Sequence, residues 1–437
     1  MKPGLLPIIE SEQLLKCTTS RCPVCQASCP AEVWRVGGRP AKVFLKRTCP
    51  QHGEASVCIA SDARFYWLAK GKSENACCSA GGASVLASRA SLSDTNGSAV
   101  ASLRQSTCCS ADGSTMGTLG RNAAGRGDAP FEKLSTCLAL IEIVNSCNLS
   151  CPTCYADSPL GAGHEVDAAP LQELQRRIQG VVDRKGGIEI LQLSGGEPTL
   201  HPRFFELVEW IQSNPGIDYV LLNTNGVRIV HDDEFLAGLA QVVRRGNFQL
   251  YLQFDGVQLE GQHFLRGTDL RATRLRAIER CRDIKLPITL AMTVTPDNLP
   301  FLWPTMEFGL QFPHIRGVSF QPMFQSGRFS RLGSGVLESA KKSFDANLVP
   351  QTQEAGPQTR LNTADIILAA VEQSQGKLRF EDFTPLPCGD PNCATIGYLL
   401  RANGRTYSIS DFIDFTRVQD FLHDKVRYSL EDLMKCG

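Results

Sequence analysis

The sequence predicts an α/β protein whose largest domain is an open, partial barrel of six βα units. A small metal-knuckle module precedes the barrel, and an extension with further cysteines follows it. Two observations predict the barrel. From residue 138 onward, short apolar runs alternate with amphipathic segments, which is typical of parallel strands joined by helices. Motifs rich in cysteine, glycine or amides directly follow four of these runs, at the strand ends where such folds carry functional residues.

Composition divides the chain into four segments. We expect the knuckle module over residues 1–72, a mobile linker over 73–130, the barrel over 131–330 and the extension over 331–437. The linker is rich in Ser, Gly and Ala, and so few apolar side chains cannot offset the entropy that is lost on ordering. Its Cys77-Cys78 pair recurs as Cys108-Cys109, which indicates a duplicated cysteine-bearing segment.

The first module carries two cysteine knuckles. Cys22 and Cys25 stand in the sequence CPVC, and Cys49 precedes His52 in CPQHG. Sulfur and imidazole ligands at this spacing are typical of a tetrahedral zinc or mononuclear iron site of rubredoxin-like type. His52 and Cys58 compete for the fourth position. The alternative is a metal-free loop, but a module this small needs a staple to be stable.

The strands and helices of the barrel follow from periodicity. The strand candidates are the apolar runs at residues 138–144, 188–193, 219–223, 249–254, 288–294 and 317–321. Amphipathic segments between them predict helices over residues 171–184, 203–213, 233–243, 270–284 and 299–310. Beyond the barrel we expect a short helix from about Asn362, a proline-rich turn and a last helix over residues 429–435.

The most informative motif follows the first strand candidate. Cys147, Cys151 and Cys154 form a C-x3-C-x2-C triplet, and Tyr155 comes directly after it. Three thiolates can hold three irons of a four-iron, four-sulfur cluster and leave the fourth iron open to another ligand. A zinc knuckle or a set of structural thiols would explain a C-x2-C pair alone.

A glycine-rich motif follows the second strand candidate. Gly195 and Gly196 lack side chains, so a ligand could approach their backbone closely, and Glu197 comes next. A plain turn between a strand and a helix is the alternative. Polar side chains end the later strands, where they could contact a ligand or cap the next turn. These residues are Asn223, Asn225, Gln253 and Gln321.

Together these motifs resemble those of the radical S-adenosylmethionine (SAM) superfamily. The resemblance implies that the triplet holds the cluster and that the open iron binds the amino and carboxylate groups of SAM. One electron then releases a 5′-deoxyadenosyl radical. Gly195, Gly196 and Glu197 would lie near the methionyl ammonium, and the backbone of Tyr155 would line the adenine site. The amides expected at the ribose or the carboxylate are Asn223, Asn225, Gln253 and Gln321.

A closer resemblance extends over most of the chain. The tetraether lipid synthase type of radical enzyme, also carried under the name 7,8-dihydro-6-hydroxymethylpterin dimethyltransferase, is similar in the CPVC, CPQHG, LSGGEPTLHP, LNTNG, LQFDG and RGVSFQP segments. It implies hydrogen abstraction from an unactivated carbon. Carbon–carbon bond formation on a lipid chain is the leading expectation, and methylation of a pterin-like small molecule is the second. A long apolar channel would favour the lipid, and a small polar pocket the pterin. From a different class, a non-catalytic metal-binding or thiol-sensing protein is a third alternative.

The resemblance also implies an auxiliary four-iron, four-sulfur cluster. Its candidate ligands are Cys388 and Cys393 in the C-terminal extension and Cys137 just before the first strand. Free surface thiols are the alternative for the C-terminal pair. The family usually has a G-C-P-x-D-C-G-x-C-P run in the region of the linker, and this sequence has the cysteine pairs instead.

Charge and composition limit the partners. Lys+Arg and Asp+Glu balance at 45 each, so no basic field indicates nucleic acid. The 18 cysteines are clustered as in metal sites of a reducing compartment. No run reaches the roughly 20 apolar residues that span a bilayer. We therefore expect a cytoplasmic enzyme that could still contact a membrane peripherally. The resemblance adds a low-potential electron donor, a flavodoxin or a ferredoxin, and a lipid or small-molecule substrate.

Overall fold

The computed structural model describes residues 12–66, 138–160, 166–324, 327–328, 360–385 and 394–413. The chain divides into two compact units, Met1–Phe131 and Glu132–Gly437, and each unit is described by itself. The expected linker and the expected last helix lie outside the described residues. The same holds for the three expected ligands of an auxiliary cluster, Cys137, Cys388 and Cys393.

The first unit is a four-stranded antiparallel sheet in the order β1-β2-β3-β4. Its elements are β1 (Gln13–Arg21), β2 (Ser28–Val36), β3 (Lys42–Cys49), β4 (Gly53–Ala60) and the turn η1 (Ala63–Phe65). In an antiparallel meander, the first and third turns fall at the same end of the sheet. These are the turns at residues 22–27 and 50–52, so the strand order alone brings the two knuckles together. Val33, Val43 and Ala60 form the small apolar core.

The second unit contains a six-stranded parallel sheet in the order β10-β9-β8-β7-β6-β5. The strands are β5 (Leu138–Val144), β6 (Ile188–Gly195), β7 (Ile217–Thr224), β8 (Phe248–Gln253), β9 (Ile288–Val294) and β10 (Ile315–Pro322). Each strand therefore pairs with the next one in the sequence. This architecture confirms the predicted α/β fold with six strands.

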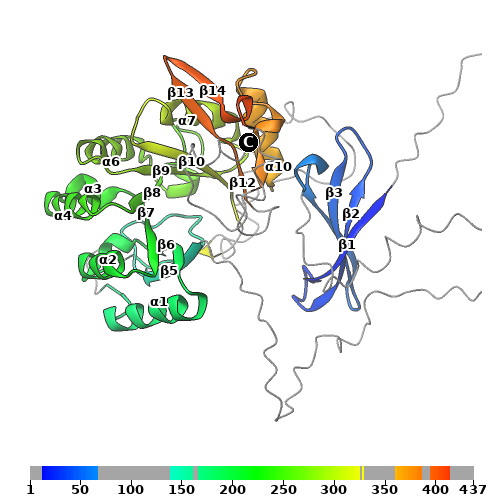
Figure 1. Ribbon diagram of the computed structural model, residues 1–437. Coiled ribbons are helices and arrows are strands. Elements are labelled where there is room, and N and C mark those ends of the chain that lie inside the picture. Colours follow the sequence, from blue (N-terminus) through cyan, green and yellow to red (C-terminus); the bar gives the residue numbers. More distant parts are fainter. Residues whose placement is uncertain are drawn as a thin grey trace, which may run out of the picture. The chain divides into compact units, whose positions relative to one another are not determined.

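Helices cover one face of this sheet. They are α1 (Leu171–Lys185), α2 (Phe204–Ser213), α3 (Val227–His231), α4 (Asp233–Arg244), α5 (Gln262–Arg266), α6 (Arg271–Asp283) and α7 (Leu302–Gly309). The helix expected over residues 299–310 is divided into a 3-10 turn, η3 (Leu299–Phe301), and α7. Pro304 lies in the first turn of α7, where an N–H has no intrahelical acceptor, whereas in one helix that began at residue 299 its missing N–H would remove a helical hydrogen bond. Figure 1 shows α1, α2, α3, α4 and α6 along the same side of the strands.

The apolar core lies between that helix layer and the sheet. Successive residues of a strand point to opposite faces, so alternate positions enter the core. Leu193, Leu222, Leu250 and Leu290 are fully buried strand residues of the core cluster. Leu207 is one of the fully buried helix residues that belong to the same cluster. The strand residues at the intervening positions point to the opposite face of the sheet and lie outside this core.

The C-terminal part adds α10 (Thr363–Gln373), which begins with a capping box between Asn362 and Asp365 and confirms the helix expected there. Ile366 and Ala370 pack with Trp303 of α7 in a second core cluster. Two short antiparallel pairs follow: β11 (Thr384–Pro385) with β12 (Thr395–Ile396), and β13 (Leu399–Ala402) with β14 (Arg405–Ser408). Within the described parts of the chain, every helix is too short or too polar to cross a membrane.

Candidate functional site

The first unit gathers four potential metal ligands, which we call the metal cluster: Cys22, Cys25, Cys49 and His52. Their donor atoms all lie within 4.8 Å of one another. His52 Nδ1 is 3.6 Å from the sulfurs of both Cys22 and Cys49, and the sulfurs of Cys25 and Cys49 are 3.9 Å apart. Thiolates bound tetrahedrally at about 2.3 Å from zinc lie about 3.8 Å apart. The spacing therefore suits a single tetrahedral ion.

Of the two residues that compete for the fourth ligand position, the structure places His52 in the metal cluster. Cys58 lies on β4 opposite Phe44 instead. The backbone N–H of Cys25 lowers the pKa of the Cys22 thiol to about 6, although burial opposes this shift. The thiolate that a metal requires is thus available at neutral pH. Cys29, a fifth cysteine, is buried in contact with Cys22 and Cys49, and no motif of the sequence predicts a role for it.

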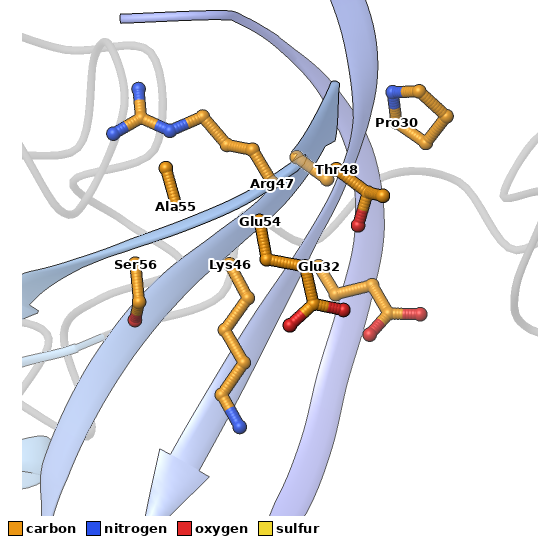
Figure 2. Close-up of a pocket in the computed structure, with 9 residues that line it drawn as sticks. Pro30, Glu32, Lys46, Arg47, Thr48, Glu54, Ala55 and Ser56 are labelled. Carbon is orange, nitrogen blue, oxygen red and sulfur yellow. The ribbon is translucent and has the colours of Figure 1, made fainter. Parts of the chain in front are cut away.

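An open groove lies on the same sheet. It is lined by residues of β2, β3 and β4 and by Glu54 and its neighbours, and its charged side chains include Glu32, Lys46 and Glu54 (Figure 2). Lys46 also pairs with Glu12 at 2.9 Å. Because the groove mixes both signs of charge and holds none of the expected site residues, we assign it no ligand.

In the second unit, the cysteine triplet lies on residues 145–160, which we call the cysteine loop. The loop leaves β5 and folds back on itself, because Cys147 N–H donates to Pro159 O at 2.9 Å and Cys154 N–H donates to Cys151 O at 3.2 Å. Cys151 is buried, while Cys147 and Cys154 are half-buried, and all three are free thiols. Three thiols on one short, partly dry loop fit the ligand set of a cluster with one open iron.

The surroundings of Cys147 are both buried and negative. Burial raises the pKa of its thiol to about 12, and the nearby Glu197, Cys151 and Cys154 add to that rise. Leu149 N–H, 3.4 Å from the sulfur, opposes it. At neutral pH this thiol is therefore protonated until a metal displaces the proton.

Close packing against the backbone after β5 requires glycine at both glycine positions of the GGEP motif. A Cβ on Gly195 would lie 2.1 Å from Val144 O, and one on Gly196 would lie 2.2 Å from Ser146 O. The N–H of Gly196 donates to Val144 O at 2.7 Å, and that of Glu197 to Ser146 O at 2.9 Å. The end of β6 thus packs directly against the backbone that leaves β5. An ammonium ion only donates hydrogen bonds, so it would bind the carbonyl oxygens of this turn.

Glu197 ties the GGEP motif to the end of β7. Its Oε1 accepts from the N–H and hydroxyl of Thr199 and from the hydroxyl of Thr224, and its Oε2 accepts from Asn225 N–H at 2.8 Å. Burial raises the pKa of this carboxyl, whereas these four donors favour its ionised form. Its contact with SAM stays a prediction, and its structural role is evident from these bonds.

The expected amide residues are engaged in different ways. Asn225 donates to Asn148 of the cysteine loop at 2.7 Å and caps the next turn by accepting from Val227 N–H at 3.0 Å. Asn223 accepts from Gln192 at 2.6 Å and donates to Ser194 at 3.2 Å. Asn225 is therefore the expected amide that reaches the cysteine loop.

The remaining expected residues lie further along the strands or on the surface of the loop. Gln253 accepts from Arg274 at 2.9 Å, and Gln321 donates to the hydroxyl of Tyr251 at 2.8 Å. Tyr155 is exposed over more than half of its surface. An adenine site at Tyr155 is thus sterically accessible, whereas Gln253 already has a charged partner.

The second unit also contains two arginines that sequence reasoning did not single out as site residues. Arg328 contacts the cysteine loop through both its backbone and its guanidinium, and Arg266 lies against the same loop from α5. Gly327 precedes Arg328 at a φ of 63°, and a Cβ there would lie 2.1 Å from Tyr155 O. The Gly-Arg pair in the sequence was the available signal for this contact.

The face of the six-stranded sheet opposite the main helix layer is largely polar. In-register residues of neighbouring parallel strands share a face, and the pairs Asn223–Tyr251, Tyr251–Thr289 and Thr293–Gln321 define it. We call this surface the polar face, and its members on β6 to β10 are Gln192, Ser194, Asn223, Gln249, Tyr251, Gln253, Thr289, Thr293, Ser319 and Gln321. Ile190, Leu221 and Ala291 interrupt it, and the edge strand β5 adds Leu138, Leu140 and Glu142.

Side chains of the polar face bond to one another. The hydroxyl of Tyr251 donates to Ser319 at 2.6 Å, in addition to accepting from Gln321. Gln249 donates to Thr289 at 2.6 Å. These groups are hydroxyls and amides that can both donate and accept. Such a surface suits a ligand with several hydrogen-bonding edges and little charge.

Comparison with known proteins identifies the two units. Residues 14–61 match the HMPTM N-terminal zinc ribbon domain. Residues 141–308, which hold the cysteine loop, the GGEP motif and strands β6 to β9, match the radical SAM superfamily. The second unit therefore contains a radical SAM domain. Such a domain implies a four-iron, four-sulfur cluster and SAM, and it confirms the resemblance found in the sequence.

This radical SAM protein has relatives of two named activities. It is 24% identical to 7,8-dihydro-6-hydroxymethylpterin dimethyltransferase of Methanocaldococcus jannaschii, over 94% of this chain and 73% of that protein. It is 25% identical to GTP 3′,8-cyclase of Chlorobaculum tepidum, over 43% of this chain and 56% of that protein. Among solved structures, SuiB of Streptococcus suis bound to S-adenosylmethionine gives a TM-score of 0.36 at 14% identity, over 47% of this chain and 48% of that one.

Proposed function

We propose that this radical SAM enzyme acts on a polar heterocyclic small molecule such as a pterin, and that it methylates that substrate. When bound, the cluster and SAM supply the 5′-deoxyadenosyl radical that abstracts hydrogen from an unactivated carbon. The observation that carries the substrate class is the polar face, with its row of uncharged amides and hydroxyls on β6 to β10. The pterin methyltransferase relative supports the same class.

A pterin has several ring nitrogens and exocyclic groups at its edges, and these need donors and acceptors. Tyr251, Ser319 and Gln321 already bond among themselves and can exchange those bonds for bonds to a ligand. An alkyl chain in the same position would add no hydrogen bonds to those that these groups already make, whereas a heterocycle would also pair with their remaining donors and acceptors. The polar face therefore favours a heterocycle over a lipid chain.

Carbon–carbon bond formation on a lipid chain, the leading expectation from the sequence, is the second candidate. Leu138 and Leu140, on the edge strand β5, favour it, because they are 45% and 51% exposed on the same side of the sheet. Together with Ile190 and Leu221 of the neighbouring strands, they form an apolar stretch at one side of a larger polar face. We therefore rank a lipid substrate below a pterin-like substrate.

For the cofactors, we propose Cys147, Cys151 and Cys154 as cluster ligands. The carbonyl oxygens of Gly195 and Gly196 would bind the ammonium of SAM, because their turn packs against the backbone that leads into the cysteine loop. Asn225 orients that loop through Asn148. A flavodoxin or a ferredoxin would supply the electron.

For the other metals, we propose that Cys22, Cys25, Cys49 and His52 hold one structural zinc or iron, which their spacing supports. An auxiliary cluster at Cys137, Cys388 and Cys393 stays a prediction from the family resemblance, because these residues lie outside the described ones.

Anaerobic reconstitution with iron and sulfide, followed by reduction in the presence of SAM, tests the proposal. We expect a reduced pterin to increase 5′-deoxyadenosine formation and to gain methyl mass, while an acyl lipid does neither. Cys151→Ala should form no 5′-deoxyadenosine, and Cys58→Ala, a half-buried cysteine of β4, should behave as wild type. Turnover of the lipid with no response to the pterin would overturn the substrate assignment.

A variant of the polar face makes the substrate test specific. Tyr251→Phe removes one hydroxyl that both donates and accepts. Loss of one hydrogen bond to the substrate would raise KM for the pterin roughly tenfold, which is about 1.4 kcal/mol. Basal cleavage of SAM without substrate should stay unchanged. An unchanged KM would show that the polar face does not bind the substrate.

A further inference from the structure

Helix α5 packs against the cysteine loop. The hydroxyl of Thr153, between the second and third cysteines of the triplet, donates to Leu265 O at 3.1 Å, and this contact is buried. On the other side of Arg266, a Cβ at Gly267 would lie 3.5 Å from Cδ of Pro152. Arg266 is thus held at the loop by contacts of both its neighbours. Its guanidinium interacts with the thiol of Cys151.

Arg266 is fixed by a buried carboxylate. Its Nε and one terminal nitrogen donate to the two oxygens of Asp255 at 2.7 and 2.8 Å, and the same terminal nitrogen donates to Thr293 at 3.0 Å. The side chain of Arg266 is 9% exposed and that of Asp255 is 1% exposed. This forked arrangement leaves the guanidinium little freedom to move away from the cysteine loop.

A second buried arginine shares the same carboxylate. Arg274 lies 3.1 Å from Asp255 and its side chain is fully buried. Its other hydrogen-bond partners are neutral oxygens of Phe254, Gln253 and Gln262. Its Nε has no hydrogen-bond partner among the described residues. Arg274 therefore adds a charge that Asp255, already engaged by Arg266, does not fully balance.

Arg266, Arg274 and Asp255 form a buried group with two positive charges and one negative charge. Asp269 also attracts Arg274, but its carboxylate pairs with Arg271 at the surface. A buried charge without a counter-charge is strongly unfavourable, so an anion is required nearby. Both arginines also interact electrostatically with Cys151, so a cluster held at that sulfur would bring the balancing negative charge.

We propose that Arg266, supported by Arg274, supplies the counter-charge of the cluster held at Cys151 and thereby raises the reduction potential of that cluster. Reduction adds one negative charge, and a fixed positive charge at a ligand sulfur stabilises the reduced form more than the oxidised one. Arg266 is a positioning and tuning residue in this role. The inference rests on the proposed cluster site at the triplet.

Redox titration of the reconstituted protein without SAM, followed by electron paramagnetic resonance, tests this role. Arg266→Gln keeps donors and removes the charge, and we expect its equilibrium constant for reduction to fall at least tenfold, or about 59 mV for one electron. Arg266→Lys, which keeps the charge, should fall by less than threefold. Arg280→Gln is the matched control, because Arg280 donates to Val230 O and does not contact the cysteine loop.

A variant of opposite sign completes the test. Asp255→Asn removes the carboxylate that the two arginines share, keeps a side chain that tolerates the φ of 59° at this position, and should raise the potential. If Arg266→Gln takes up no cluster, Arg266→Lys and Asp255→Asn still provide the comparison. Wild-type potentials in Arg266→Gln and Asp255→Asn, or a shift that appears only with SAM, would overturn the inference. Failure of the proposed function differs, because then the wild type itself would take up no redox-active cluster.

Discussion

Arg328 follows the edge strand β10 and holds the cysteine loop in place through hydrogen bonds. Replacement of Arg328 should therefore allow the loop to open. The residue follows β10, yet its backbone N–H donates to Cys154 O at 2.9 Å and its guanidinium donates to Cys151 O at 2.8 Å. The guanidinium also donates to Ser158 O and pairs with Asp157 at 3.2 Å. Two of these carbonyls belong to the cysteines of the triplet.

The expected loss of stability of the cysteine loop follows from the contacts that Arg328→Ala removes. Each hydrogen bond from a charged donor contributes about 1.5–3 kcal/mol. Because the side chain is 24% exposed, water can replace part of each bond, and the ion pair with Asp157 contributes at most about 1 kcal/mol. We therefore expect about 2–4 kcal/mol less stability of the loop, which corresponds to roughly a 30- to 1,000-fold shift in its open population. Arg328→Lys should fall between, because an ammonium cannot fork across two carbonyls.

The assay is the rate at which an iron chelator removes the cluster from reconstituted protein, together with the melting temperature. We expect much faster iron loss in Arg328→Ala with a small change in melting temperature, because the loop and not the core is weakened. Arg401→Ala is the control: Arg401 also donates to one carbonyl, that of Leu310, but far along the chain from the triplet. Iron loss at the wild-type rate in Arg328→Ala would refute the reasoning.

Other measurements test the glycine turn, the metal cluster and the cysteine triplet. Gly196→Ala should cost at least about 1–3 kcal/mol of folding stability, since its Cβ would lie 2.2 Å from Ser146 O, and an unchanged melting curve would contradict this. Zinc in the first unit should be retained at pH 7 and released only below about pH 6. The lowered pKa of Cys22 stabilises the folded thiolate form above its ordinary value of 9.0, and this contribution is lost as pH falls through about 6. A release midpoint above pH 7, followed with a zinc dye, would disagree. In metal-free protein, Cys147 should be alkylated far more slowly at pH 8 than the exposed Cys25, because the Cys147 thiol stays protonated up to about pH 12; equal rates by mass spectrometry would show that its surroundings are not buried.

Local sequence patterns predicted the strands, but they missed two short helices and the division of a longer one. The apolar run at residues 138–144 matches β5 end to end, because alternation and burial are properties of the run itself. Helices α3 and α5 were not expected, since each has 5 residues, too few to show a helical period. The long helix expected over residues 299–310 is divided after Phe301, so that Pro304 falls in the first turn of α7.

The candidate site shows the same division. The cysteine triplet and the metal cluster could be predicted because their ligands recur at short, characteristic spacings. The Gly-Arg pair marks Arg328 in the sequence, but its contact could not be predicted, because 177 residues separate it from Cys151 and the contact exists only once β10 lies in place. The polar face was equally hidden, since it depends on the register of five strands and not on any one segment.

These contacts explain why the cysteine loop needs the whole sheet. The triplet spans only a few residues after β5, but each side of its loop is held by a different strand end. Asn225, after β7, bonds to Asn148; Leu265, in the segment after β8, accepts from Thr153; Arg328, after β10, binds the carbonyls of the loop. Because the six strands of this sheet are parallel, these groups meet at the end of the sheet that the C-termini of its strands form. A change in strand register would therefore displace the cysteine sulfurs even if no residue of the triplet were altered.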